Sequence, residues 1–184
     1  MLFITVVSLL IAGTSAGTLQ PGPCPNITGI DFDMNRFVGK WRDYASTDDL
    51  YHNTLRCVTH FWEPPVNGVS NVFSTGITRT SLLDEVESQA YLSKPDNGIH
   101  LTTVIPMIGT QSIEYWDLED IYDNDSICWS CKEVGSYHLQ TITIWTRRNI
   151  PRGDVIGRAR QLAAQKGLAA AHFGFYFNPC NEFI

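Results

Sequence analysis

The chain has 184 residues and a formal net charge of −6 at pH 7, and its basic residues form no runs. Proteins grip nucleic acids through clustered basic side chains that contact phosphates, so this composition argues against a nucleic-acid partner. The length suits one domain with a sizeable hydrophobic core.

The chain begins with the pattern of a secretory signal peptide. An uncharged apolar run covers residues 1–12, and small residues follow as far as Ala16. The run is shorter than the roughly 20 residues that a membrane helix needs, so we expect cleavage after Ala16 rather than stable membrane insertion. The expected product is a secreted, extracellular protein with a single domain over 17–184.

Eight β-prone segments separated by turn residues follow between Val38 and Arg147, without a helical pattern between them. This predicts an all-β fold, an eight-stranded antiparallel up-and-down β-barrel whose interior holds one small ligand. The expected strands are Gly39–Ser46, Cys57–Glu63, Val69–Thr75, Val86–Leu92, Ile99–Ile105, Ser112–Leu118, Ile127–Lys132 and His138–Arg147.

One C-terminal α-helix is expected from Asp154 to Lys166, a stretch rich in Ala, Arg, Gln and Leu. Asp154 suits the N-cap, and Gly167 suits the position just beyond the last turn. Val155, Ala159, Leu162 and Ala163 recur at helical spacing, which predicts an apolar stripe packed on the outside of the barrel.

Five cysteines in an exported chain predict two disulfides and one extra thiol, but their number leaves the pairing open. Cys128 and Cys131 have the spacing of a redox or zinc motif. On a strand, however, residues three apart face opposite sides, so the sulfurs of Cys128 and Cys131 are not expected to share a metal or a redox partner. No pair of the scattered histidines has the helical spacing of a metal site, so no metal is expected.

The segment Gly39-Lys40-Trp41, preceded by a short helical turn at 33–37, resembles the Gly-x-Trp signature of the lipocalin family. Arg147 ends the last expected strand, where that family places an arginine that stacks on the tryptophan. The resemblance implies that Gly39, Trp41 and Arg147 are structural, because an indole covered by a guanidinium plugs the closed end of the barrel. The family's middle motif is only partly matched, by Glu119-Asp120-Ile121-Tyr122.

The cysteine positions and the entry segment Cys24-Pro25-Asn26 are similar to those of the arthropod bilin-binding and apolipoprotein D-like lipocalins. That resemblance implies the disulfides Cys24–Cys131 and Cys57–Cys180, with Cys131 in a structural disulfide and Cys128 as the extra thiol. It also implies an extracellular carrier that transports or sequesters a small hydrophobic ligand. A bilin such as biliverdin is the first candidate for a bound chromophore, with fatty acids, sterols, retinoids and carotenoids as alternatives.

Ligand-binding residues are predicted from aromatic character and from strand alternation. Keeping charges outside puts Val86, Ser88 and Ala90 on the inner face of the fourth strand, and keeping Lys132 outside puts Trp129 on the inner face of the seventh. A lid loop between the first two strands adds two polar side chains, which a solvated loop tip explains equally well. The predicted set is Tyr51, His52, Phe61, Phe73, Val86, Ser88, Ala90, Leu101, Trp116 and Trp129.

Two alternatives to a simple carrier remain at this stage. A lipocalin-fold enzyme would act on a lipid through the thiol of Cys128, the one candidate nucleophile, although we expect no catalysis. A subunit of an oligomeric pigment complex would bind copies of itself. Two sequons, at Asn26 and Asn124, predict N-glycosylation, with Asn26 favoured because its Pro-rich and Gly-rich segment is expected to be exposed.

Overall fold

The computed structural model describes residues 19–47, 55–93, 96–105, 109–172, 174–178 and 180. The expected signal peptide and the predicted ligand residues Tyr51 and His52 lie outside these ranges. Within them no helix is long and apolar enough to cross a lipid bilayer.

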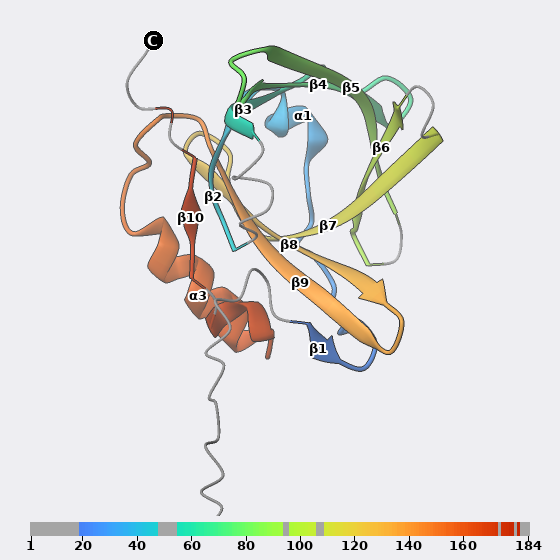
Figure 1. Ribbon diagram of the computed structural model, residues 1–184, viewed down its shortest axis with the longest axis vertical. Helices are drawn as coiled ribbons and strands as arrows, with labels where there is room; N and C mark the ends of the chain where they lie inside the picture. The colour runs from blue at the N-terminus through green and yellow to red at the C-terminus, as the bar shows by residue number, and fades with distance from the viewer. Residues whose placement is uncertain are drawn as a thin grey trace, which may run out of the picture.

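Eight antiparallel strands form a closed barrel, as the alternating sequence predicted (Figure 1). Each strand pairs with the next in the chain, and β9 also pairs with β2, which closes the sheet. Residues 88–92 of β5 pair with β6, whereas residues 83–87 pair with β4 alone. The strands are β2 (Gly39–Ser46), β3 (Leu55–Trp62), β4 (Val69–Thr78), β5 (Leu83–Leu92), β6 (Ile99–Ile105), β7 (Gly109–Ile121), β8 (Asp125–Val134) and β9 (Tyr137–Thr146).

The short helix α1 (Met34–Phe37) begins at Asp33, whose side chain accepts a hydrogen bond from the backbone N–H of Asn35, and it lies at the end of the barrel where β2 starts. The indole N–H of Trp41 donates to the carbonyl of Phe37 at 2.7 Å. The guanidinium of Arg147 covers the Trp41 ring at 3.8 Å. This end of the barrel is therefore plugged by a buried aromatic stack.

The Arg147 guanidinium is satisfied by backbone carbonyls rather than by an acid. It donates to Tyr122 at 2.9 Å, to Lys40 at 3.0 Å and to Phe37 at 3.3 Å. Gly39 has φ +100°, and a Cβ there would lie 3.4 Å from the guanidinium, which explains the glycine of the motif. Gly39, Trp41 and Arg147 thus meet as a structural unit.

Helix α3 (Val155–Gln165) packs on the outside of the barrel. Its N-cap, Asp154, accepts a hydrogen bond from the backbone N–H of Gly157 at 2.8 Å. The buried helix residues Val155, Ala159 and Ala163 form one cluster with Ile142 and Ile144 of β9. A 3₁₀ turn, η1 (Ala169–His172), follows and contributes Ala170 and Ala171 to the same cluster.

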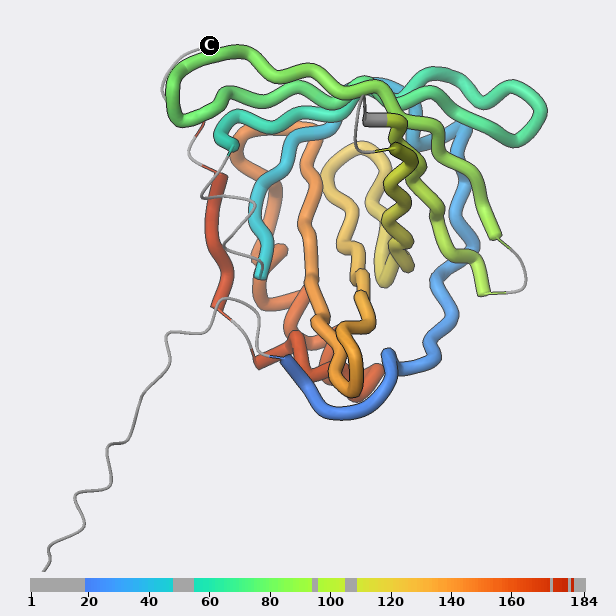
Figure 2. The backbone as a smooth tube through the Cα atoms, turned by 45° about the vertical axis from the view of Figure 1, so that its right-hand side comes forward, coloured from blue at the N-terminus to red at the C-terminus, as the bar shows by residue number. Residues whose placement is uncertain are grey.

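Both ends of the described chain are tied to the barrel wall. Strand β1 (Gln20–Pro21) pairs with β9, and β10 (Tyr176–Phe177) pairs with β2. The disulfides Cys24–Cys131 and Cys57–Cys180 fasten the same two segments, in the pairing that the resemblance implied. Figure 2 shows the N-terminal segment, in blue, running around the outside of the barrel from below the β8–β9 hairpin.

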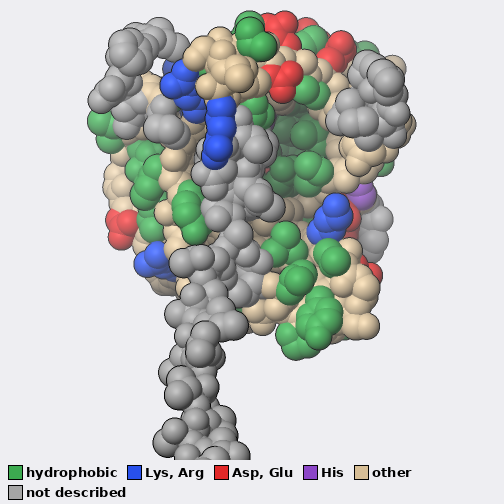
Figure 3. All heavy atoms as spheres, viewed as in Figure 1, with side chains coloured by type: hydrophobic (Ala, Val, Ile, Leu, Met, Phe, Trp, Pro, Cys, Tyr) green, Lys and Arg blue, Asp and Glu red, His purple; other side chains and the backbone are tan. Residues whose placement is uncertain are grey.

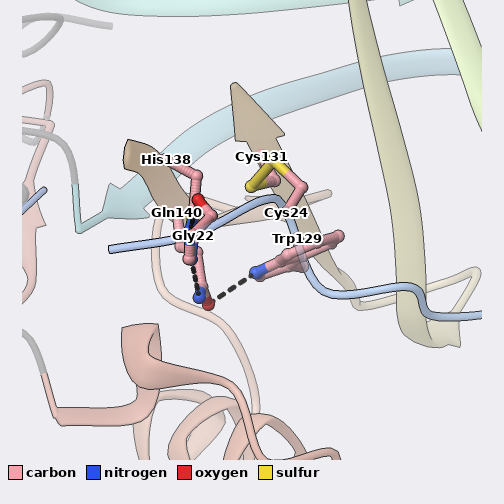
Figure 4. Close-up of a disulfide and its surroundings, with 6 residues drawn as sticks. All are labelled: Gly22, Cys24, Trp129, Cys131, His138 and Gln140. Carbon is pink, nitrogen blue, oxygen red and sulfur yellow. Dashed lines mark hydrogen bonds between the residues drawn. A yellow bond between two sulfur atoms is a disulfide. The ribbon is translucent and has the colours of Figure 1, made fainter. Parts of the chain in front are cut away.

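Buried hydrogen bonds fix the N-terminal segment beside the Cys24–Cys131 bridge (Figure 4). The indole N–H of Trp129 donates to Gln140 at 3.2 Å, and the Gln140 amide lies 2.9 Å from Nε2 of His138. The other ring nitrogen of His138 lies 2.9 Å from the carbonyl of Gly22. This chain of polar contacts lies outside the barrel and supports its wall.

Candidate functional site: the barrel interior

The inner face of β5 carries a predicted wall of small and apolar side chains. Ser88 and Ala90 are buried, and Val86 is half-buried, opposite Ser74 of β4. Across the next pairing, Ala90 lies opposite Leu101 of β6. Ala90 and Leu101 pack in the inner cluster that also contains Trp41, Trp62 and Trp145. Alternation thus brings Val86, Ser88, Ala90 and Leu101 together on one side of the interior.

Four aromatic side chains of the predicted set belong to the described residues, and all four lie elsewhere. Phe61 and Phe73 are opposite each other in the β3–β4 pairing and are 49% and 38% exposed on the outer face. Trp116 and Trp129 contact each other at a ring separation of 5.2 Å and pack with the cluster beneath α3. These four side chains point away from the interior, so the inner-face position predicted for Trp129 is wrong, and Phe61, Phe73 and Trp116 do not line the interior either.

The misplacement of Trp129 follows from Lys132. Lys132 is on the same side of β8 as the inner residues Ser126 and Cys128, but it lies two residues before the strand ends at Val134 and is exposed there. The Lys132 ammonium group therefore reaches solvent although its side chain is on the inner face of β8. The rule that a charged residue lies on the outer face of a strand fails at a strand end. Ile127 and Trp129 occupy the opposite face, where α3 buries them.

Aromatic rings fill the end of the interior that lies next to α1. Phe37, Trp41 and Trp62 are almost fully buried next to α1. Trp145 packs against Phe37 and Trp62, and its ring is 5.3 Å from the His60 ring and 5.5 Å from the Tyr115 ring. Figure 3 shows that the molecule is hollowed between β5 and β7, with hydrophobic side chains in the hollow. We take Trp145 and its neighbours as the floor of a ligand chamber.

Two ionisable side chains belong to this floor. Asp43 lies opposite Trp145 in the β2–β9 pairing, is 5% exposed, and has no hydrogen-bond partner at Oδ1. Burial raises the pKa of Asp43 to about 8. His60, opposite Trp41 on β3, is 2.8 Å from the hydroxyl of Ser74. Burial lowers the pKa of His60 to about 4, so its imidazole is neutral at pH 7.

A second acidic group lies on the inner faces of β7 and β8. Burial raises the pKa of Asp117 well above its usual value, and the charge of nearby Asp120 raises it further. Burial also raises the pKa of Asp120 to about 6. The two carboxyl groups interact with each other, and a hydrogen bond between them needs a proton on one of the pair. Cys128, fully buried beside Asp117, has a pKa raised well above its usual value by burial.

Sequence reasoning missed Asp43, His60, Asp117 and Asp120 as interior residues. A usable signal exists for one of them, because Asp43 is two residues from the motif tryptophan Trp41 and so faces the same side of β2. Asp120 has no such signal, because a bulge between Asp117 and Glu119 changes the alternation of β7.

Two other predicted features concern the outer surface. Asn26 is exposed. Asn124 is buried, and its amide nitrogen donates to Asp125 and to the carbonyl of Arg152. A glycan on that nitrogen would break both hydrogen bonds, so we retain Asn26 alone as the proposed glycosylation site. Among the described residues, no group of three His, Cys, Asp or Glu side chains is arranged to hold a metal ion.

A further concave region lies outside the barrel beside α1. It has a volume of about 510 Å³ and is bordered by the segment 31–35, by Pro65 and Gly68 of the β3–β4 turn, and by Leu92. Its borders combine apolar side chains, Phe32, Met34, Pro65 and Leu92, with the polar side chains of Asp31, Asp33 and Asn35. We place the ligand in the interior because the predicted residues Ser88, Ala90 and Leu101 meet there.

Comparison with known proteins supports this reading of the fold. No family model matches the chain. Apolipoprotein D of Cavia porcellus is 23% identical over 162 residues, covering 84% of this chain and 82% of that protein. Lazarillo protein of Schistocerca americana is 28% identical over 148 residues, covering 78% of this chain and 68% of that protein. Insecticyanin from Manduca sexta has a similar solved structure, with a TM-score of 0.76, 17% identity and 90% of each chain covered.

These likenesses indicate the lipocalin family. The Gly-x-Trp signature and its arginine are present at Gly39, Trp41 and Arg147, and their geometry is the plugged end described above. The barrel interior, between this plug and the opposite end, is where the chain presents inward-facing apolar side chains together with the buried Asp43 and His60.

Proposed function

We propose that this lipocalin is a secreted carrier that binds a small hydrophobic ligand inside the barrel, with a bilin such as biliverdin as the first candidate. The observation that carries the proposal is the inner wall formed by Val86, Ser88, Ala90 and Leu101 above an aromatic floor. Transfer of an apolar molecule from water into such a chamber is favourable, and the few polar groups fix its orientation.

Two features support an extracellular location. Two disulfides are formed between distant parts of the chain, which suits an oxidising compartment. Asn26 is accessible for glycosylation. Expression in a secretory host should yield a protein that begins at Gly17, and Asn26→Gln should abolish its shift in mass on enzymatic deglycosylation. A product that keeps residues 1–16 would contradict the proposal.

The binding test uses neighbouring positions that face opposite sides of β5. Val86→Trp fills the chamber, whereas Glu87→Trp adds the same side chain on the outer face, next to Phe73. Titration with biliverdin, followed by quenching of tryptophan emission and by the visible absorbance of the bilin, should show saturable binding to wild type and to Glu87→Trp. Val86→Trp should lose at least about tenfold in affinity. Equal binding by both variants would contradict an interior site.

The alternative of an enzyme acting through Cys128 is disfavoured by the environment of that thiol. The side chain is fully buried, and its pKa is raised well above the usual value by burial, with the charge of Asp117 adding to the effect. Nucleophilic cysteines depend on the thiolate, which this environment suppresses. We therefore propose binding without catalysis.

Association of several copies is the remaining alternative. Phe61 and Phe73 form an exposed apolar pair on the outer face of β3 and β4. Exposed aromatic side chains are common in protein interfaces. Light scattering of the purified wild type and of a Phe61→Ser/Phe73→Ser variant tests association through this pair. A dimer mass for the wild type and a monomer mass for the variant would support association. A monomeric wild type would contradict it.

A further inference from the structure

Asp43 is a buried carboxyl group whose acceptor Oδ1 has no partner in the protein. The side chain is 5% exposed and lies on the inner face of β2. A buried polar atom without a hydrogen bond destabilises the folded state, so such atoms call for an explanation in native proteins. Asp43 lies opposite Trp145 in the β2–β9 pairing, at the floor of the proposed ligand chamber, so a ligand that reaches this floor can supply the missing hydrogen bond.

The surroundings of Asp43 suit a cation better than a neutral or anionic group. Trp145, opposite Asp43 on β9, is 5.5 Å from the ring of Tyr115, and aromatic faces attract cations. His60 approaches the same indole at 5.3 Å, and its lowered pKa leaves it neutral, so it does not repel a positive charge. The remaining ionisable groups on adjacent inner faces, Asp117, Asp120 and Cys128, are neutral or anionic.

We propose that Asp43 binds a basic nitrogen of the ligand, at the floor of the chamber beside Trp145 and Tyr115. This inference rests on the proposed carrier function and specifies the polar end of the cargo. A neutral ligand nitrogen takes the proton from the Asp43 carboxyl with its lone pair, and the resulting N–H⁺ donates to the carboxylate. A nitrogen that arrives protonated displaces the Asp43 proton into solvent. Both routes end in the same ion pair.

Two kinds of ligand supply this chemistry. The imine-type nitrogen of a linear tetrapyrrole is basic, and so is the nitrogen of a small aliphatic amine. The Asp43 carboxyl is protonated in the empty chamber at pH 7, because burial raises its pKa to about 8, and it becomes a carboxylate when a basic nitrogen takes its proton. A ligand without a basic nitrogen gains no ion pair at this floor.

The first arm of the test compares 2-phenylethylamine with 2-phenylethanol, which share one apolar body and differ in the charged nitrogen. Calorimetric titration of the full-length protein should give at least about tenfold tighter binding of the amine. Asp43→Asn should remove this preference while the affinity for the alcohol changes less than about twofold. Glu87→Gln, which makes the same change of charge on the outer face, should leave both affinities unchanged.

The second arm uses the absorbance of bound biliverdin, because protonation of its imine-type nitrogen moves the long-wavelength band to the red. The wild type and Glu87→Gln should show this red-shifted band. Asp43→Asn should bind biliverdin with the band of the neutral pigment. A change in the first arm alone identifies an amine as the cargo, and a change in the second alone identifies a bilin.

The outcomes separate the two proposals. If the wild type binds 2-phenylethanol or biliverdin but shows neither the preference for the amine nor the red-shifted band, the role of Asp43 is refuted and the carrier function stands. The same holds if Asp43→Asn reproduces the wild type in both arms. If none of the three compounds binds the wild type, the carrier function itself is contradicted. The comparison within the wild type needs no variant, so a folding defect in Asp43→Asn leaves the test decisive.

Discussion

Replacement of Asp43 by Asn should raise the free energy of unfolding above pH 6.5 and should flatten its dependence on pH. Burial raises the pKa of Asp43 from 3.8 to about 8 in the folded protein. Between these values the folded protein holds a proton that the unfolded chain has lost, so its stability falls as the pH rises. One such group changes the free energy of unfolding by at most about 1.4 kcal/mol per pH unit.

Other buried groups determine where this slope is best measured. The pKa of His60 is lowered from 6.5 to about 4, so between these values the unfolded chain holds the extra proton and stability rises with pH. His60 therefore opposes Asp43 below pH 6.5 and contributes nothing above it. The raised pKa of Asp120, about 6, acts in the same direction as that of Asp43 but is also exhausted near pH 6.

Asp43 accordingly contributes a loss of up to about 2 kcal/mol between pH 6.5 and 8, and Asp117 adds a slope of the same sign that both proteins share. Urea unfolding of wild type, Asp43→Asn and the exposed control Glu87→Gln, with disulfides intact, measures the difference at several pH values in this interval. Asp43→Asn should be more stable and its profile shallower. Parallel profiles for wild type and Asp43→Asn would refute a buried, protonated Asp43.

Three further predictions concern the rest of the fold. Arg147→Ala removes the guanidinium from the Trp41 ring and deletes its hydrogen bonds to the carbonyls of Tyr122, Lys40 and Phe37, so chemical unfolding should show a loss of about 2 to 4 kcal/mol. Arg147→Lys should recover only part of this loss, and an unchanged unfolding midpoint would argue against the plug. Ile144→Ala creates a cavity between β9 and α3 and should cost about 2 to 5 kcal/mol in the same assay, whereas a similar truncation of the exposed Val104 should cost little. Cys128 should resist a thiol reagent in the native protein and react after unfolding without reductant, and rapid labelling of the native protein would show that the thiol is accessible.

Local signals explain why the elements of the barrel were predictable. Turn residues and alternation mark strand positions, and β2 and β6 have the predicted bounds. The orientation of β5 was also predictable. Glu85 and Glu87 lie on one face of the strand, which indicates that this face is exposed to solvent and that the opposite face is the inner one. On β8 the large apolar side chains Ile127 and Trp129 lie on the outer face, where α3 covers them, and the inner face carries smaller residues such as Ser126 and Cys128. The rule that the more apolar face points inward therefore fails on this strand.

Bulges hid the orientation of the residues beyond them, including the buried acid Asp120. A bulge between Asp43 and Ala45 lets Tyr44 and Ala45 both pack on the outer cluster, and the bulge between Asp117 and Glu119 does the same on β7. Each bulge reverses the alternation partway along a strand, so a rule that extends one parity along the whole strand fails beyond it. The positions of bulges depend on pairing with neighbouring strands, which a single segment does not reveal.

The position of these acids indicates a division of roles within the barrel. The Arg147 plug satisfies its charge completely and stabilises one end, which allows the floor above it to retain an unpaired carboxyl. A residue kept only for structure should stabilise the protein, whereas a residue kept for binding is often retained at a cost in stability. Asp43→Asn should therefore increase stability and decrease affinity for a basic nitrogen in the same protein. A structural role for Asp43 does not produce that opposition, because its loss would lower stability and leave the ligand preference unchanged.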